Sequence, residues 1–136
     1  METLAPANDP RPEQPQDRGE RSGAALRAFF KIAEAWRLTA DEQLVLLGSP
    51  ARSTLFKWKK EGGHLSQDTF ERISYILGIY KALEILFPDD NAADEWVRKP
   101  NNAPMFNGAS ALQRILGGKV ADLYIVRSYL DAQRGG

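Results

Sequence analysis

Apolar residues recur at helical spacing through most of the chain, and this pattern begins at Ala24. Successive apolar residues lie three or four positions apart, so they line one face of a helix. No segment alternates with the period of two that marks a half-buried strand, and no repeat of 20 to 50 residues is visible. The pattern predicts an all-α fold of six or seven helices. The apolar face of the first helix carries Leu26, Phe29, Phe30, Ala33 and Trp36.

Capping residues divide the region after Trp36 into two short helices. Thr39 is a plausible N-cap of the first of them, and Gly48 ends it. Ser49 followed by Pro50 is typical of an N-cap followed by the first helical residue, which predicts a second short helix over about residues 50–60. The two short helices are therefore joined by a tight turn.

The rest of the chain alternates helical patterns with breaks. Ser66 predicts the start of the longest helix, which continues to Phe87 and ends before Pro88. A short amphipathic segment follows at residues 92–98, then an Asn-rich loop. We expect another short helix around residues 112–116 and a last helix over about residues 120–133, with glycines between them.

Residues 1–23 differ from the rest of the chain in composition. They hold four of the eight prolines, eight charged residues and no aromatic residue. Such a segment buries too little apolar surface to offset the entropy lost on ordering. We therefore expect a disordered arm over residues 1–23, either a solvated tail or a flexible partner-binding segment.

Charge is unevenly distributed although the total is zero, with 18 basic and 18 acidic residues in 136. Residues 24–63 hold seven basic and four acidic residues, whereas the segments on either side carry a net negative charge. Nucleic-acid binding depends on where basic side chains gather, so the basic middle is the candidate DNA-binding region.

Composition also excludes several kinds of site. No cysteine is present, which rules out disulfides, thiolate zinc sites and a cysteine nucleophile. His64 is the single histidine, so a catalytic triad or a histidine-rich metal site has no candidates, and we expect a structural or solvent-exposed role for it. No apolar run approaches the roughly 18 residues of a membrane span. We expect a cytoplasmic protein with no membrane contact, no metal and no cofactor.

The two short helices predict a helix-turn-helix, in which the first helix braces the second and the second lies in the major groove of DNA. Leu55 and Trp58 would anchor the second helix on the core and turn its other face outward. Arg52 is suited to guanine O6 and N7, Ser53 to a base or a phosphate, and Phe56 to a thymine methyl group. The predicted phosphate contacts are Lys57, Lys59 and Lys60.

An ordinary solvated face would also carry these three lysines. The combination of a short helix, a tight turn and a second helix with outward basic residues, all in the net-positive region, favours DNA binding. One such unit with this little charge binds specific DNA weakly. We therefore predict a homodimer that reads two half-sites about 34 Å apart.

The carboxyl half carries a series of features that follows the predicted helix-turn-helix in a recognisable order. Trp96 lies in a short helix, and Pro100, Asn101 and Asn102 form the loop after it. A short Leu-rich helix follows Gly108, then a Gly-containing break and a final helix that ends in glycine. In this order of elements, residues 24–136 resemble antitoxins of the Xre, MbcA and ParS type, which partner RES-domain toxins.

The resemblance implies that the carboxyl-terminal domain binds a toxin that consumes NAD or transfers ADP-ribose from it, and that the chain's tail blocks the toxin's NAD pocket. It also implies that the amino-terminal domain binds operator DNA and represses the antitoxin's own operon.

Gly135 and Gly136 lack side chains and so could enter a narrow pocket, where Arg134 would pair with an acidic group. A frayed polar terminus is the alternative. Tyr129 is expected at the surface, whereas Trp96 and Leu123 are expected in the core. The candidate toxin-binding residues are Asn101, Asn102, Tyr129, Arg134, Gly135 and Gly136.

We thus predict a helix-turn-helix and dimerisation region over residues 24–87 and a small helical toxin-binding domain over residues 88–136. A stand-alone transcriptional repressor, whose carboxyl half only dimerises or senses a small molecule, is the alternative. An enzyme is disfavoured. Asp89, Asp90, Asp94 and Glu95 form the one dense carboxylate group, and at a helix start such residues usually cap the helix and interact with its dipole.

Overall fold

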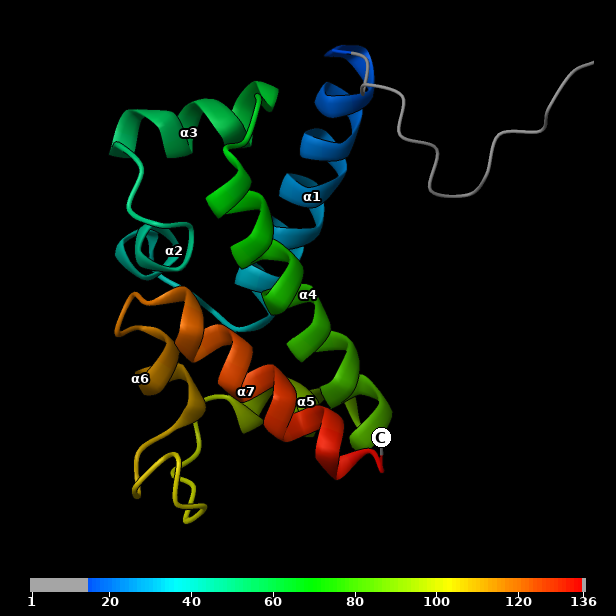
Figure 1. Cartoon of the computed structure of the whole chain (residues 1–136), viewed down its shortest axis with the longest axis vertical. Helices are drawn as coiled ribbons and strands as arrows, with labels where there is room; N and C mark the ends of the chain where they lie inside the picture. The colour runs from blue at the N-terminus through cyan, green and yellow to red at the C-terminus, as the bar shows by residue number, and fades with distance from the viewer. Residues whose placement is uncertain (1–14, 136) are drawn as a thin grey trace, which may run out of the picture.

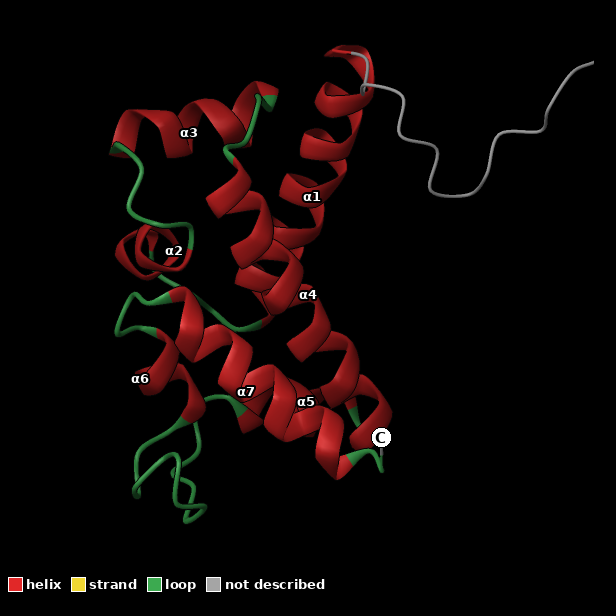
Figure 2. Cartoon of the chain, viewed as in Figure 1, coloured by secondary structure: helices red, strands yellow, loops and turns green. Residues whose placement is uncertain are grey.

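The chain forms seven helices in the part that the structure, a computed structural model, describes: the backbone of residues 15–135 and the side chains from Gly19 to Gly135. Figure 2 shows helices joined by loops, the longest loop lying between the fifth and sixth helices, and the described residues form no strand beyond an isolated bridge between Pro100 and Ser110. The predicted all-α fold is confirmed. The helices are α1 (Pro15–Ala35), α2 (Ala40–Leu46), α3 (Arg52–Glu61), α4 (Gln67–Leu86), α5 (Asp90–Trp96), α6 (Ala111–Ile115) and α7 (Val120–Gln133).

Helix α4 runs through the middle of the molecule and is shared by its two halves. It packs against α1 on the amino-terminal side and against α5 and α7 on the carboxyl-terminal side (Figure 1). Helix α6 packs on α7, and α3 packs on α1. The predicted division between residues 87 and 88 thus follows a helix whose side chains contact both halves.

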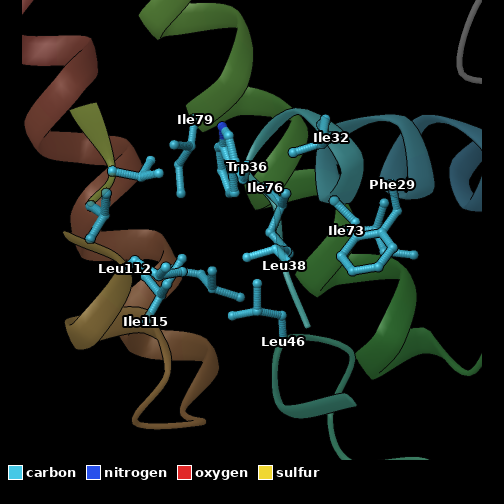
Figure 3. Packing of buried hydrophobic residues seen from close by; sticks show 14 of the residues in the cluster. Phe29, Ile32, Trp36, Leu38, Leu46, Ile73, Ile76, Ile79, Leu112 and Ile115 are labelled. Carbon is cyan, nitrogen blue, oxygen red and sulfur yellow. The ribbon is translucent and has the colours of Figure 1, made fainter. Parts of the chain in front are cut away.

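One hydrophobic core connects the halves. The same cluster of buried residues contains Phe29 of α1, Trp36 directly after α1, Ile76 of α4 and Leu112 of α6. Figure 3 shows these side chains together with Leu46 of α2. The helix-turn-helix and the carboxyl-terminal helices therefore lack separate cores.

Several helix starts agree with the predicted caps. The Thr39 hydroxyl accepts a hydrogen bond from the Glu42 amide at 3.1 Å, and the Glu42 carboxylate accepts one from the Thr39 amide at 2.8 Å, which together form a capping box. The Ser66 hydroxyl accepts a hydrogen bond from the Thr69 amide at 3.1 Å at the start of α4. The bounds predicted for the last helix, 120 and 133, are those observed for α7.

The predicted disordered arm over residues 1–23 is wrong for its last nine residues, which begin α1. Ser22 is buried, and its hydroxyl accepts a hydrogen bond from the Leu65 amide at 3.2 Å. The Arg21 guanidinium lies 4.9 Å from the centre of the Phe70 ring. Polar side chains of this segment thus find partners around the start of α4, which a composition argument does not register. Residues 1–14 lie outside the described residues.

Candidate nucleic-acid and protein interfaces

The turn between α2 and α3 is built from two residues with left-handed backbone. Gly48 has φ +92° and Ser49 has φ +60°, and the Ser49 amide donates a hydrogen bond to the Leu44 carbonyl at 2.8 Å. Ala51 is the N-cap of α3, and no side chain caps this end. The prediction that Ser49 caps the helix and Pro50 opens it is therefore wrong. The left-handed Ser49 extends the turn, so the helix begins at Arg52.

Helix α3 is anchored on one side and exposed on the other. Leu55 is fully buried and Trp58 is half-buried, as predicted. The opposite face is exposed, including the Phe56 side chain, which is 52% exposed. All six predicted DNA-binding residues of this helix are exposed: Arg52, Ser53, Phe56, Lys57, Lys59 and Lys60. Lys59 lies on the side of the helix that faces α1.

Two of these cations have partners within the protein. Arg52 forms an ion pair with Asp41 of α2, and both side chains are exposed. The Lys59 ammonium lies 5.6 Å from the centre of the Phe30 ring of α1. An exposed ion pair contributes little to stability, so an anionic partner can displace Asp41, which in the free protein holds the Arg52 guanidinium next to α2.

The sequence analysis missed one candidate cation, Arg27. It is exposed on α1 and lines the same groove as Lys59 and Lys60, at the end of α3. The basic surface thus extends from α3 onto α1. The signal in the sequence was the position of Arg27 off the apolar face of the first helix, but periodicity did not reveal that this side turns toward α3.

The two candidate residues of the Asn-rich loop, Asn101 and Asn102, have different surroundings. Asn101 pairs with Ala109 and Gly108 through its backbone at 3.0 and 3.1 Å, and its side-chain oxygen accepts a hydrogen bond from the Ala103 amide at 2.8 Å. It is half-buried and holds the loop closed. Asn102 beside it is exposed and open to a partner.

Tyr129 belongs to an aromatic cluster, so its expected place at the surface is wrong in part. It stacks on Trp96 with ring centres 6.4 Å apart and meets Phe106 edge-on at 5.3 Å. The ring is half-buried because the loop after α5 folds Phe106 against α7. Leu123 is buried as expected, and Trp96 is half-buried.

The exposed aromatic residue of α7 is instead Tyr124, 56% exposed, which meets Tyr75 of α4 edge-on at 5.8 Å. Ile85, 61% exposed, is the other large apolar side chain at the surface of the carboxyl half among the described residues. Helical periodicity alone did not separate these exposed residues from the core face of their helices.

The tail follows directly from α7. Arg134 is exposed, and its guanidinium lies 3.5 Å from the Asp131 carboxylate. Gly135 has φ +89°, and Gly136 lies outside the described residues. The end of α7 lies apart from the Asn-rich loop in Figure 1. The five candidate toxin-binding residues that the structure describes therefore do not gather at one point.

One carboxylate at the start of α5 caps the helix, and another within α5, Asp94, is half-buried. The Asp89 side chain accepts a hydrogen bond from the Asn91 amide at 3.1 Å and caps α5, as predicted. Burial, and secondly the nearby Asp90, raise the pKa of Asp94. Burial, and then Asp94, raise the pKa of Tyr80.

In the described part of the chain no group of three or more histidine or acidic residues is placed to hold a metal ion, and His64 is exposed.

None of the helices between residues 15 and 135 is long and apolar enough to cross a membrane.

Comparisons with known proteins divide the chain into two domains. Residues 15–78 match the model of the antitoxin Xre-like helix-turn-helix domain, and residues 82–136 match that of the antitoxin Xre/MbcA/ParS C-terminal toxin-binding domain. The chain is 58% identical over 126 residues to the uncharacterized protein y4oB of Sinorhizobium fredii, an alignment that covers 93% of this chain and 96% of that protein.

Proposed function

Because the chain belongs to the Xre/MbcA/ParS family of antitoxins, with a helix-turn-helix domain and a toxin-binding domain, we propose that it neutralises a RES-domain toxin and represses its own operon. In this proposal the protein acts by occupying surfaces on other macromolecules. The order of the two matched domains in one chain is the observation that carries it. The exposed basic face of α3 supports the DNA-binding part.

Neutralisation is assigned to the carboxyl-terminal segment, which would enter and block the toxin's NAD pocket. The exposed Arg134 and the side-chain-free Gly135 support this assignment, because a narrow anion-binding pocket admits such a segment. Exposed Asn102 would contact the toxin from the loop, while Asn101 keeps that loop in shape. Tyr129 would act mainly by supporting α7 from within the aromatic cluster.

Repression is assigned to a homodimer that places α3 of each copy in successive major grooves, about 34 Å apart. Arg52, Ser53 and Phe56 would face base edges, and Lys57, Lys59 and Lys60 would face phosphates. Arg27 would add a phosphate contact from α1.

Coexpression with the product of a neighbouring toxin gene tests the proposal as a whole. We expect the RES-type protein to arrest growth when produced alone, and to be harmless and copurify when produced with this chain. A stand-alone repressor would instead bind the promoter and retain no toxin. Failure of every neighbouring gene product to copurify contradicts the antitoxin assignment.

Removal of residues 134–136 is expected to abolish neutralisation while the complex still forms, since α5, α6 and the whole of α7 remain. The measurement is NAD consumption by the toxin with full-length or shortened antitoxin, next to gel filtration of the complex. Gln133→Ala, which alters the exposed residue just before the deleted segment, serves as the control. Full inhibition by the shortened chain would show that the tail does not block the pocket.

Substitutions in α3 are expected to separate base recognition from phosphate contact. Arg52→Ala should cost about 1–3 kcal/mol at one base pair of the operator. Lys59→Ala should weaken binding to all sequences alike and lower the salt slope by about one. Titrations of operator and scrambled duplexes at several salt concentrations measure both effects. If both variants bind the operator as the natural chain does, α3 is not the reading helix.

A further inference from the structure

Helix α2, which braces the reading helix, is only seven residues long. A helix of this length has little stability of its own, so its position depends on tertiary contacts. Helix α2 makes only a few close backbone contacts with any one of the other described helices. Besides the buried Leu46 and Leu47, side chains from other elements hold α2 at its ends. Arg98 pairs with Glu42 in its first turn, and the Thr69 hydroxyl of α4 donates a hydrogen bond to the Leu47 carbonyl at 3.0 Å.

Arg98 follows α5 in the toxin-binding domain and reaches the corner between α1 and α2. Its guanidinium donates two hydrogen bonds to the Trp36 carbonyl, at 3.0 and 2.8 Å, and one to the Arg37 carbonyl at 3.0 Å. These are carbonyls at the end of α1, where a cation is favoured by the helix dipole. Arg37 itself has φ +57°, so the same guanidinium supports a strained corner.

Arg98 is also connected to the reading helix through the first turn of α2. Its guanidinium lies 3.7 Å from the Glu42 carboxylate, the same carboxylate that accepts a hydrogen bond from the Thr39 amide in the capping box. The residue before Glu42 is Asp41, which forms the ion pair with Arg52 at the start of α3. Two adjacent carboxylates thus link an arginine of the toxin-binding domain to the arginine that faces DNA.

Arg72 of α4 lies beside the turn that follows α2 and connects it to the turn before α7. Only 12% of its side chain is exposed. It pairs with Asp68 at 2.9 Å and donates a hydrogen bond to the Gly118 carbonyl, in the turn before α7, at 2.9 Å. The turn after α2 lies against this pair, because a Cβ added to Gly48 would come within 2.9 Å of the Asp68 carboxylate and 3.1 Å of the Arg72 Nε.

We propose that Arg98 and Arg72 are positioning residues through which the toxin-binding domain sets the orientation of α2 and, through Asp41, of Arg52. The helix-turn-helix would then depend on the other half of the chain for its DNA-reading geometry, and a partner bound near α5 or α6 would act on DNA affinity by the same route. The inference rests on the proposed DNA binding. The central claim of the inference, that Arg98 holds α2 in place, is also testable without DNA.

The first test compares full-length Arg98→Ala with Lys99→Ala, which removes the same charge one residue further along. The probe is the duplex that lies directly upstream of the coding sequence, with a scrambled duplex beside it. We expect Arg98→Ala to bind the upstream duplex about ten-fold more weakly, because α2 loses the support of the Arg98 hydrogen bonds, and to keep an unchanged salt slope. Lys99→Ala should bind like the natural chain.

The double variant Arg98→Ala/Arg52→Ala distinguishes positioning from general destabilisation. If Arg98 acts through Arg52, the double variant binds about as weakly as Arg52→Ala alone, whereas Arg98→Ala combined with Lys59→Ala shows the product of the two losses. Independent losses for Arg98 and Arg52 would overturn the proposed route.

Amide hydrogen exchange over residues 40–47 supplies the readout that needs no DNA. We expect faster exchange in Arg98→Ala than in Lys99→Ala, and the same direction for Arg72→Gln. Arg98→Lys keeps the charge but loses the forked donor geometry, so it should lie between them and is the variant to use if Arg98→Ala does not fold. If the natural chain binds no upstream DNA, the proposed repression fails. If exchange or affinity is the same in Arg98→Ala and Lys99→Ala, the positioning role fails.

Discussion

Replacing Trp36 with alanine is expected to lower the free energy of unfolding by about 3–5 kcal/mol, the range for removal of a buried aromatic side chain. Trp36 is 1% exposed and lies where α1 ends. Its ring faces Tyr80 of α4 at 6.4 Å. Its backbone carbonyl accepts the Arg98 hydrogen bonds, so the loss of the ring disturbs the junction between the two halves. Urea denaturation of the full-length chain, followed by far-ultraviolet circular dichroism, measures the change.

Trp36→Phe is the matched control. The indole Nε1 of Trp36 is buried with no hydrogen-bond partner, so phenylalanine keeps most of the apolar volume and removes an unsatisfied donor. We expect a clearly smaller loss than for alanine. Because one core connects the halves, each variant should unfold in a single transition. Two separate transitions, or equal losses for the two variants, would contradict this account of the core.

Gly48→Ala is expected to cost about 2–5 kcal/mol, the second largest effect. Its φ of +92° is strained for any residue with a side chain, which costs about 1–2 kcal/mol. The added methyl group also meets Asp68 and Arg72, and crowding of this kind costs about 1–3 kcal/mol. Thermal and urea unfolding of the full-length variant measure the total.

Gly62→Ala isolates the backbone contribution. Gly62 also has a left-handed backbone, φ +74°, but no atom lies within 4 Å of a Cβ added there, apart from its chain neighbours. We expect a cost of about 1–2 kcal/mol, from strain alone. A loss at Gly62 as large as that at Gly48 would show that the Asp68–Arg72 pair does not press on the turn.

Local signals predicted the parts of the fold that local physics controls. Thr39 and Ser66 cap helices because a short hydroxyl side chain satisfies the free amides of a first turn, whatever lies elsewhere in the chain. Leu55 is buried and Phe56 exposed because helical geometry turns neighbouring residues to different faces. The exposed basic face of α3 followed from the same argument.

One failure arose in a local turn, and two arose where a distant segment decides. Ser49 and Pro50 have the chemistry of a helix start, but Ser49 takes a left-handed backbone and the helix begins two residues after Pro50. Ser22 is polar and was assigned to a disordered arm, yet the Leu65 amide gives it a buried partner. Tyr129 looked like a surface residue until the loop after α5 brought Phe106 against it.

The sequence by itself therefore determined the helical class, several helix ends, the exposed basic side of α3 and the resemblance to antitoxins, because each depends on residues close to one another in the chain. Tertiary structure alone decided that the two halves share α4 and one core. It also decided that Arg98 crosses from the toxin-binding domain to the corner of the helix-turn-helix, 61 and 62 residues away in sequence. Such a contact has no local signature, because the residues next to an arginine in the sequence do not indicate whether its side chain faces solvent or the carbonyl groups of a distant helix.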